Sequence, residues 1–175
     1  LQDKVQKLKT EGYTSPNFGE NSCLDSGAST KDIYDAVGKR VVDGSLRGVN
    51  GTILAYGQTS SGKTHTMLGD QKHPGVVRIA VQDVFNHIDN CDERSFLLQM
   101  SMCEIYNEVV ADLLKKDNKP LNVFTAKGGK DVVIKGITEE HIKSPQHVFE
   151  LLEKGFQNRS VSGTDMNAVS SRSHT

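Results

Sequence analysis

Residues Gly57 to Thr64 read Gly-Gln-Thr-Ser-Ser-Gly-Lys-Thr, and they directly follow an apolar run, Thr52 to Tyr56. The pattern G-x-x-x-x-G-K-[ST], placed between a strand and a helix, is typical of a phosphate-binding loop. Its small residues allow backbone N–H groups to face a phosphate chain, and a helix N-terminus adds partial positive charge. We therefore predict that Lys63 contacts phosphate oxygens and that the Thr64 hydroxyl binds Mg²⁺. The alternative is a flexible Gly/Ser loop with an unrelated lysine.

The composition is that of an ordinary water-soluble protein. The chain has 175 residues with 21 basic and 22 acidic side chains, a size that suits one domain or part of one. A net charge of −1 and the lack of a long apolar run predict neither a nucleic-acid nor a membrane partner. The cysteines Cys23, Cys91 and Cys103 lack disulfide or zinc spacing, so we expect a reducing compartment, the cytoplasm.

Helical and strand-like patterns alternate along the chain and predict an α/β layer fold. Ser29-Thr30-Lys31-Asp32 is a helix-start signal, with a hydroxyl cap and an acidic residue three places on. Helices are expected over 29–48, from Gly62, over 76–90 and from Ser144, separated by a turn over 69–75. Strands are expected over Thr52–Tyr56, Ser95–Tyr106, Leu121–Phe124 and Val132–Ile137, with a short apolar turn or helix over Val109–Leu114.

Each of the three longer helices is expected to bury one apolar face. The predicted faces are Ile33, Val37, Val41 and Leu46; then Val77, Val81, Val84, Phe85 and Ile88; and finally Val148, Phe149, Leu151, Leu152 and Phe156.

A second polar cluster, Asn167-Ala-Val-Ser-Ser-Arg-Ser-His174, lies far from the phosphate loop in the sequence. Hydroxyls beside an arginine can coordinate Mg²⁺, position a water molecule or complete a phosphate site. Alone, the same pattern is typical of a solvated Ser/Arg-rich tail.

Taken with the phosphate loop, this cluster resembles the kinesin motor domain, because further motifs stand between the two in the family's order. The matching motifs are Val49-Asn50-Gly51-Thr52-Ile53, Ala55 to Met67, Glu104-Ile-Tyr-Asn-Glu108, Asp112-Leu-Leu and Asn167 to His174. The resemblance covers residues 23–175 and leaves residues 1–22 as a poorly matched N-terminal arm. It implies an α/β fold of the P-loop NTPase type. In that fold a central, mostly parallel or mixed sheet is flanked by helices on both faces, here in incomplete form.

The resemblance also implies roles for single residues. Asn167 to His174 would form the switch I segment, in which Ser171 supplies a Mg²⁺-side hydroxyl and Ser170 helps to place the attacking water. Arg172 would pair with an acidic residue of a second switch, and His65 would pack near the adenine base. The nucleotide-binding residues of ATP or ADP would be Gly57, Gln58, Thr59, Ser60, Ser61, Gly62, Lys63, Thr64 and His65, with Thr64 and Ser171 on Mg²⁺. The catalytic set would be Asn167, Ser170, Ser171 and Arg172.

Departures from the family pattern leave an alternative open. No Asp-x-x-Gly stands at a suitable position for the second switch, and the family's Arg-x-Arg-Pro and Phe-Asp-x-Val-Phe segments are absent. The resemblance implies an ATP-hydrolysing microtubule motor head, present as a truncated segment. Alternatively, the chain is a kinesin-derived module that binds nucleotide without hydrolysing it. A small-molecule phosphotransferase is disfavoured, because the sequence lacks an arginine-bearing lid after the loop.

Microtubules are the implied partner, and the implied location is cytoplasmic, on the cytoskeleton. Lys127-Gly-Gly-Lys130, with Lys135 nearby, is similar to a family region that contacts tubulin. Lysines there would speed association with an acidic surface. A solvated hairpin tip is the alternative. Val109 and Ala111 stand where many family members have basic residues.

Two shorter motifs are weaker. Asn118-Lys119-Pro120-Leu121 begins like a guanine-reading Asn-Lys-x-Asp motif but lacks the aspartate, which favours adenine. Val109 to Asp112 mimics a Mg²⁺-binding strand end. Because Leu113-Leu114 continues the apolar run, we expect Asp112 in a helix or turn instead.

Overall fold

The structure, a computed structural model, describes residues 24, 27–70, 72–117, 119–125, 132–162 and 173–174. Its helical elements are α2 (Thr30–Ile33), the π-helical turn η1 (Tyr34–Gly38), α3 (Lys39–Leu46), α4 (Lys63–Met67), α5 (Val76–Asp89) and α6 (Pro145–Ser162). Its strands are β1 (Leu98–Met100), β2 (Cys103–Tyr106), β3 (Val109–Asp112), β4 (Pro120–Thr125), β5 (Val132–Lys135), β6 (Glu140–Ile142) and β7 (Ser173–His174). The predicted α/β class is confirmed. None of the described helices is long and apolar enough to cross a membrane.

The strands form two sheets, one with the order β1-β6 and one with the order β5-β4-β3-β2-β7. Every pairing among the described residues is antiparallel, so the parallel part of the expected sheet does not appear in them. Strands β2, β3 and β4 follow one another through short connections. Such connections join antiparallel strands, whereas a parallel pair needs a crossover of about a dozen residues or more.

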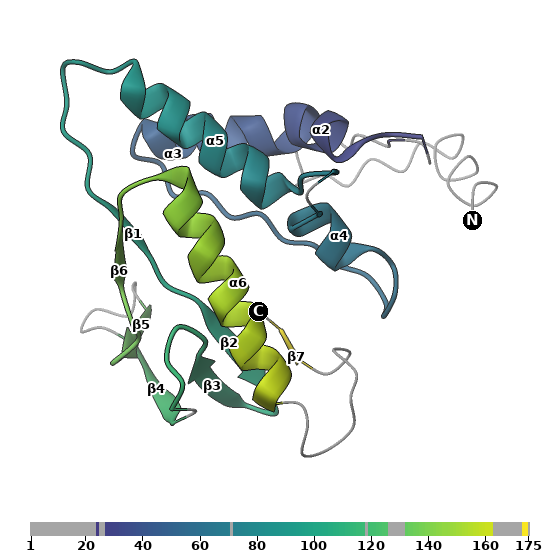
Figure 1. The fold of residues 1–175 in the computed structure, drawn as a ribbon, viewed down its shortest axis with the longest axis vertical. Coiled ribbons are helices and arrows are strands. Elements are labelled where there is room, and N and C mark those ends of the chain that lie inside the picture. Colours follow the sequence, from purple (N-terminus) through teal and green to yellow (C-terminus); the bar gives the residue numbers. More distant parts are fainter. Residues whose placement is uncertain are drawn as a thin grey trace.

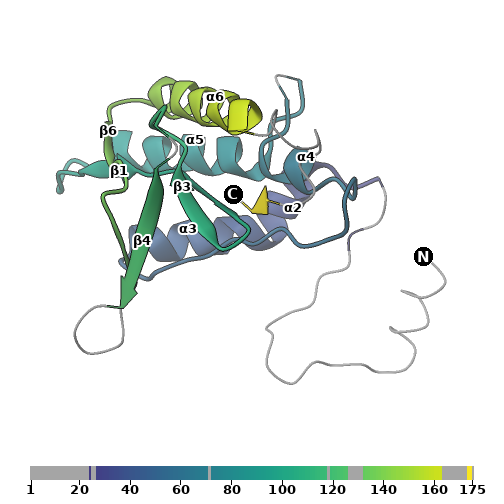
Figure 2. The same cartoon turned by 90° about the horizontal axis from the view of Figure 1, so that it is seen from below.

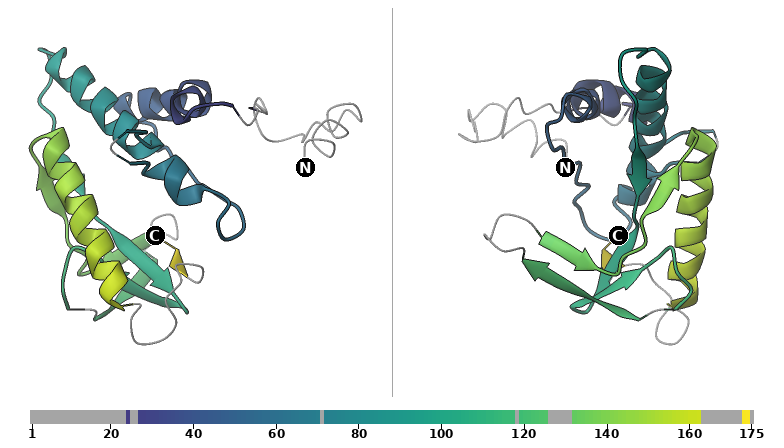
Figure 3. Two further views of the ribbon diagram at one scale, coloured as in Figure 1. Left: turned by 45° about the vertical axis from the view of Figure 1, so that its right-hand side comes forward. Right: turned by 90° about the vertical axis from the view of Figure 1, so that its left-hand side faces the viewer.

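The helices lie in layers beside the sheets. Helix α5 contacts both α3 and α6 and lies between them (Figures 1 and 2). Helix α6 runs along the strands β2 and β3 (Figure 1). The hairpin of β4 and β5 extends away from the helices (Figure 3).

The first helix runs continuously from α2 to α3 but changes its winding at η1. Its start is confirmed, because the Ser29 hydroxyl accepts a hydrogen bond from Asp32 N and the Asp32 carboxylate accepts one from Ser29 N. The π-helical turn closes wider hydrogen-bonded rings and so shifts the apolar face of the residues after it. Val37, predicted on the buried face, is consequently 47% exposed, whereas Tyr34 and Val42 are buried.

A first core cluster, here called the helical cluster, joins this helix to α5 through Tyr34, Val42 and Val76. Ile79, Ala80 and Val84 of α5 pack against it. Of the face predicted for 76–90, only Val84 belongs to this cluster, and the other predicted residues are half-buried. The difference arises because α5 is covered on two sides, so no single apolar stripe describes its burial.

The run that leads into the phosphate loop is not a strand, so the prediction for Thr52–Tyr56 is wrong. A strand requires a hydrogen-bonded neighbour, and no strand among the described residues pairs with this run. Ile53 packs against the helical cluster. Leu54 and Tyr56, by contrast, are 83% and 96% exposed.

The single strand predicted over Ser95–Tyr106 is two strands in different sheets. Strand β1 pairs with β6, and β2 pairs with β3 and β7. Between them Met102 is buried, and its carbonyl oxygen accepts a hydrogen bond from Leu113 N at 2.9 Å. The alternating pattern continues through this break, which is why the sequence reads as one strand.

A second core cluster, here called the sheet cluster, lies under α6 and consists of Met102, Leu113, Leu114 and Leu151. The face predicted for this helix is confirmed, since Val148 and Leu151 are buried and Leu152 and Phe156 flank the cluster. The predicted cap is also present, because the Ser144 hydroxyl accepts a hydrogen bond from His147 N at 3.2 Å.

Gly155 lets α6 approach the sheet closely. A Cβ atom at this position would lie 2.3 Å from the sulfur of Met102, well inside van der Waals contact.

The predicted hairpin over 121–137 is confirmed as β4 and β5, with Phe124 opposite Val133. Its tip, with Lys127 and Lys130, lies outside the described residues. Residues Val109–Asp112, predicted as a turn or helix, form strand β3 instead. The cross-strand partners on both sides, β2 and β4, are what make this short apolar run a strand.

Candidate nucleotide-binding site

The phosphate-loop sequence lies between the unpaired run 51–57 and helix α4. At its centre, Ser61 N donates a hydrogen bond to Gln58 O at 3.2 Å, which closes a tight turn. Ser60 and Gly62 have positive φ angles of 64° and 91°. Left-handed residues beside right-handed ones turn successive N–H groups to one side, which is the pattern of an anion-binding nest. Nothing lies within 4 Å of a Cβ at Gly62, so its backbone angle selects glycine.

The Lys63 ammonium lies on the loop's own carbonyl groups. Its Nζ donates hydrogen bonds to the carbonyl oxygens of Gly57, at 2.8 Å, and Gln58, at 2.7 Å. Both acceptors are neutral, whereas charged phosphate oxygens form stronger hydrogen bonds with an ammonium group. The cation is therefore placed where an anion in the loop would meet it.

Helix α4 follows at once and has only five residues, with Gly62 as its N-cap. The predicted helix is thus confirmed but short, and a macrodipole grows with the number of aligned peptide groups. The loop N–H groups and Lys63 accordingly supply most of the local positive potential. Thr64 stands in the first turn with an exposed side chain.

The turn predicted over 69–75 is confirmed and lies beside His65. The Asp70 carboxylate accepts hydrogen bonds from the backbone N–H groups of His73 and Lys72, both at 2.7 Å. These bonds hold the pKa of the Asp70 carboxyl below its usual range. The rings of His65 and His73 lie 6.5 Å apart, and both side chains are exposed.

The predicted switch segment is described only at its end. Asn167, Ser170, Ser171 and Arg172 lie outside the described residues. The last part, Ser173–His174, forms strand β7 on β2, with His174 opposite Ile105 and Ser173 opposite Tyr106. The sequence did not predict this strand.

The residues of the loop fit a nucleotide-bound Mg²⁺ ion. Magnesium keeps several water ligands and takes few protein oxygens beside the phosphates of its nucleotide. One exposed hydroxyl, that of Thr64, next to a phosphate-binding cation satisfies this need from the described part of the site. No group of three or more His, Cys, Asp or Glu side chains among the described residues could hold a metal ion.

Asp112 is a structural carboxylate at the end of β3, not the helix or turn residue predicted. It is 1% exposed and accepts hydrogen bonds from Thr138 N, Thr138 Oγ1 and Leu114 N at 2.7 to 2.8 Å. These bonds tie the end of β3 to the connection between β5 and β6. Its oxygens are thus already engaged, which agrees with the rejection of a Mg²⁺ role.

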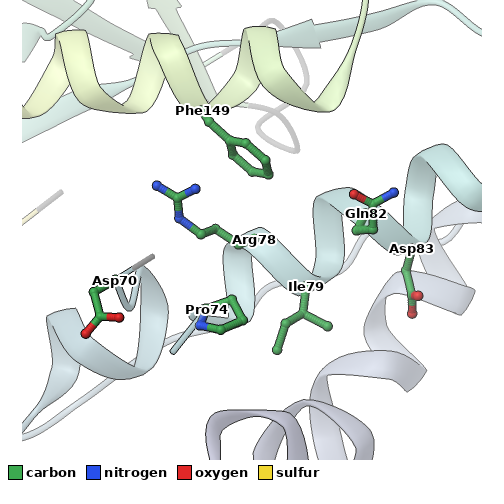
Figure 4. Close-up of a pocket in the computed structure, with 7 residues that line it drawn as sticks. All are labelled: Asp70, Pro74, Arg78, Ile79, Gln82, Asp83 and Phe149. Atoms are coloured by element: carbon green, nitrogen blue, oxygen red, sulfur yellow. The ribbon is translucent and has the colours of Figure 1, made fainter. Parts of the chain in front are cut away.

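Sequence reasoning missed a pocket of about 380 Å³ between α5, α6 and the turn after α4 (Figure 4). Pro74, Ile79, Gln82 and Asp83 line it, and the Arg78 guanidinium lies 4.6 Å from the centre of the Phe149 ring. This cation–π contact links α5 to α6. Phe149 was expected only as part of an apolar face, so neither residue carried a signal for the contact.

The sequence profile of the kinesin motor domain matches residues 2–175. The match includes most of residues 1–22, and the division at residue 23 stays a prediction. "Kinesin-like protein KIN-7G" of Oryza sativa subsp. japonica is 50% identical over 147 residues, which cover 84% of this chain and 16% of that protein. "Kinesin-like protein KIN-7L, chloroplastic" of Arabidopsis thaliana is 48% identical over 168 residues, which cover 96% of this chain and 17% of that protein. The chain thus spans 16–17% of the length of these relatives.

A solved structure of a fast kinesin, described with implications for ATPase mechanism and interactions with microtubules, shares the fold. It matches with a TM-score of 0.82 and 37% sequence identity, over 89% of this chain and 45% of that one. The kinesin type of fold is thereby confirmed for the described residues.

Proposed function

This chain belongs to the kinesin motor domain family, and from that premise we propose that it binds Mg²⁺-ATP at residues 57–64 and hydrolyses it as a microtubule motor head. The observation that carries the site is the position of the Lys63 ammonium, 2.7 to 2.8 Å from two loop carbonyl oxygens. Family membership supports the nucleotide and the track.

Binding exchanges the partners of Lys63. The ammonium leaves the carbonyl oxygens of Gly57 and Gln58 and takes anionic phosphate oxygens, a change from neutral to charged acceptors. The loop N–H groups near Ser60 and Gly62 complete the contacts to the phosphates. The Thr64 hydroxyl holds Mg²⁺, which neutralises charge on the phosphates when bound.

The remaining roles follow from the family. His65 packs near the adenine base, and the absent aspartate after Asn118-Lys119 favours adenine over guanine. Ser171 adds a second hydroxyl at Mg²⁺, while Asn167 and Ser170 place the attacking water. Arg172 pairs with an acidic residue of a second switch. These roles of the segment 167–174 are proposals from the family motif alone.

Isothermal titration calorimetry of the chain with Mg²⁺-ADP and Mg²⁺-ATP tests the site. Lys63→Ala is expected to weaken both affinities by at least about 100-fold, because several charge-assisted hydrogen bonds are lost. Lys72→Ala, an exposed lysine in the nearby turn, is the matched control and should bind like the wild type. Unchanged binding in Lys63→Ala would remove the assignment.

Phosphate release separates hydrolysis from the alternative, a family module that binds nucleotide without hydrolysing it. Microtubule-stimulated release from the wild-type chain supports the motor head. Nucleotide binding without release at any microtubule concentration supports the binding module.

Microtubule binding is proposed through Lys127, Lys130 and Lys135. Lys135 is exposed at the end of β5, in the hairpin that extends from the body. Lys135→Glu should reduce co-sedimentation with microtubules most strongly at low salt, because exposed charges are screened at high salt. Lys154→Glu, an exposed lysine on α6, is the control. Two relatives carry chloroplastic and mitochondrial labels in their names, so the cytoplasmic location stays a prediction.

A further inference from the structure

Two consecutive side chains at the end of α6 hold the strands beneath it. Arg159 Nε donates a hydrogen bond to Glu104 Oε1 of β2 at 2.9 Å. Asn158 Nδ2 donates to the carbonyl oxygen of Leu113, just after β3, at 2.7 Å. The side chains of Arg159 and Glu104 are only 19% and 10% exposed, so the ion pair is largely shielded from water.

The next residues of the same strand hold a later part of the chain. Ile105 lies opposite His174, and Tyr106 lies opposite Ser173. Figure 1 shows β7 beside β2. Arg159 and His174 are therefore anchored at neighbouring positions of β2, Glu104 and Ile105. The sequence that joins these two anchors includes Asn167 to Arg172, the proposed phosphate-sensing motif.

A buried ion pair is an unusual way to gain stability here. Removing two charges from water costs about as much free energy as their attraction returns, so an apolar pair would hold the helix equally well. What Arg and Glu add is a fixed direction, because the guanidinium is planar and its hydrogen bonds are directional. Fixing the ends of a segment also reduces the conformational entropy that is lost when the segment orders on a ligand.

We propose that Glu104 and Arg159 are positioning residues for recognition of the terminal phosphate of a nucleoside triphosphate. They fix the start of the motif's segment next to its end on β2 and touch no nucleotide themselves. This inference rests on the proposed function. It predicts that the pair sets the preference for triphosphate over diphosphate, while the phosphate loop sets the affinity for the diphosphate.

The test compares affinities for Mg²⁺-ADP and for Mg²⁺-AMPPNP, a non-hydrolysable triphosphate, by calorimetry on the whole chain. Glu104→Gln keeps the shape and an acceptor oxygen but removes the charge. It should lower the ratio of AMPPNP to ADP affinity about tenfold, the effect of weakening one charge-assisted hydrogen bond, with the ADP affinity unchanged. Arg159→Lys, which keeps the charge without the planar geometry, should lower the ratio in the same direction.

Glu108→Gln, an exposed glutamate in the turn after β2, and Lys154→Met, an exposed lysine of α6, are the controls and should keep the wild-type ratio. An unchanged ratio in Glu104→Gln and Arg159→Lys overturns the proposal, and so does an equal loss of both affinities. Should Glu104→Gln fail to fold, Arg159→Lys decides alone. If the wild type binds ADP well but shows no preference for AMPPNP, this inference fails while the phosphate-loop site stands. If the wild type binds neither nucleotide, the proposed function fails as well.

Discussion

The Tyr34 hydroxyl donates a 2.7 Å hydrogen bond to the Asp83 carboxylate and so joins the helix before the phosphate loop to the helix after it. Lys39 Nζ lies 3.3 Å from the same oxygen. Tyr34 is 1% exposed. Burial, together with the neighbouring Asp83 carboxylate, raises the pKa of the Tyr34 hydroxyl well above its usual value. The two helices that flank the loop are thus connected by a neutral donor and a charged acceptor.

Replacing this tyrosine tests the connection. Tyr34→Phe should lower the free energy of unfolding by about 1 to 2 kcal/mol, because a hydrogen bond to a charged group is lost while the ring stays packed. Urea unfolding followed by circular dichroism measures the change. Tyr56→Phe, at a position that is 96% exposed, is the matched control and should unfold like the wild type.

The same residue predicts a dependence of stability on pH. The folded chain keeps the Tyr34 proton, whereas an unfolded tyrosine loses its proton near pH 10. The contribution of Tyr34 is therefore complete below about pH 10 and decreases as the pH rises further. Unfolding at pH 9 and at pH 11 should show a smaller loss of stability in Tyr34→Phe than in the wild type. Equal losses in the two proteins would contradict the raised pKa.

Asp112 should be among the most sensitive polar positions. Asp112→Ala leaves the N–H groups of Thr138 and Leu114 without their acceptor, which should lower the free energy of unfolding by about 3 kcal/mol or more. Asp112→Asn keeps an acceptor oxygen and should lose less. Asp117→Ala, an exposed aspartate after the same strand, should change stability by less than about 1 kcal/mol. Thermal unfolding of the three variants ranks them.

Two glycines in helices are predicted to respond with opposite sign to the same substitution. Gly155→Ala forces a Cβ against the Met102 sulfur and should lower the free energy of unfolding by about 1 to 3 kcal/mol. Gly44→Ala in α3 places its Cβ no closer than 4.0 Å to a neighbour and should raise it by about 0.5 to 1 kcal/mol. A loss of stability in both variants would show that contact with Met102 is not the cause.

Backbone conformation at the loop can be separated from general strain. Gly62 and Gly48 have φ angles of 91° and 88°, and neither has a neighbour within 4 Å of a Cβ. Alanine at either position should cost about 1 to 2 kcal/mol of stability. Only Gly62→Ala should also weaken nucleotide binding, because only Gly62 belongs to the loop. Calorimetry with Mg²⁺-ADP measures this difference, and equal affinities in both variants would argue against the nest.

Local signals in the sequence predicted the elements that depend on neighbours along the chain. The capping pair Ser29 and Asp32, the breaks over 69–75 and the helix that starts after Ser144 are all set by residues a few positions apart. The phosphate loop belongs to the same class, because its turn and the position of Lys63 involve residues within six positions of each other.

Features that depend on distant partners were not predictable in this way. Val109–Asp112 is a strand because β2 and β4 lie on either side of it, and Thr52–Tyr56 is not one because the described residues offer it no neighbour. The π-helical turn at Tyr34 moved the buried face without any signal in the apolar spacing. The Glu104–Arg159 ion pair joins residues 55 positions apart, so only the fold reveals it.

The run Thr52 to Tyr56 connects directly to the phosphate loop, yet its backbone lacks a ladder among the described residues. Any strand that hydrogen-bonds to this run restricts the chain at the point where the loop begins. Thermodynamic reciprocity then requires that phosphates held in the loop strengthen that pairing by the same factor. Completion of the sheet and occupancy of the nucleotide site are, in this molecule, two readings of one equilibrium.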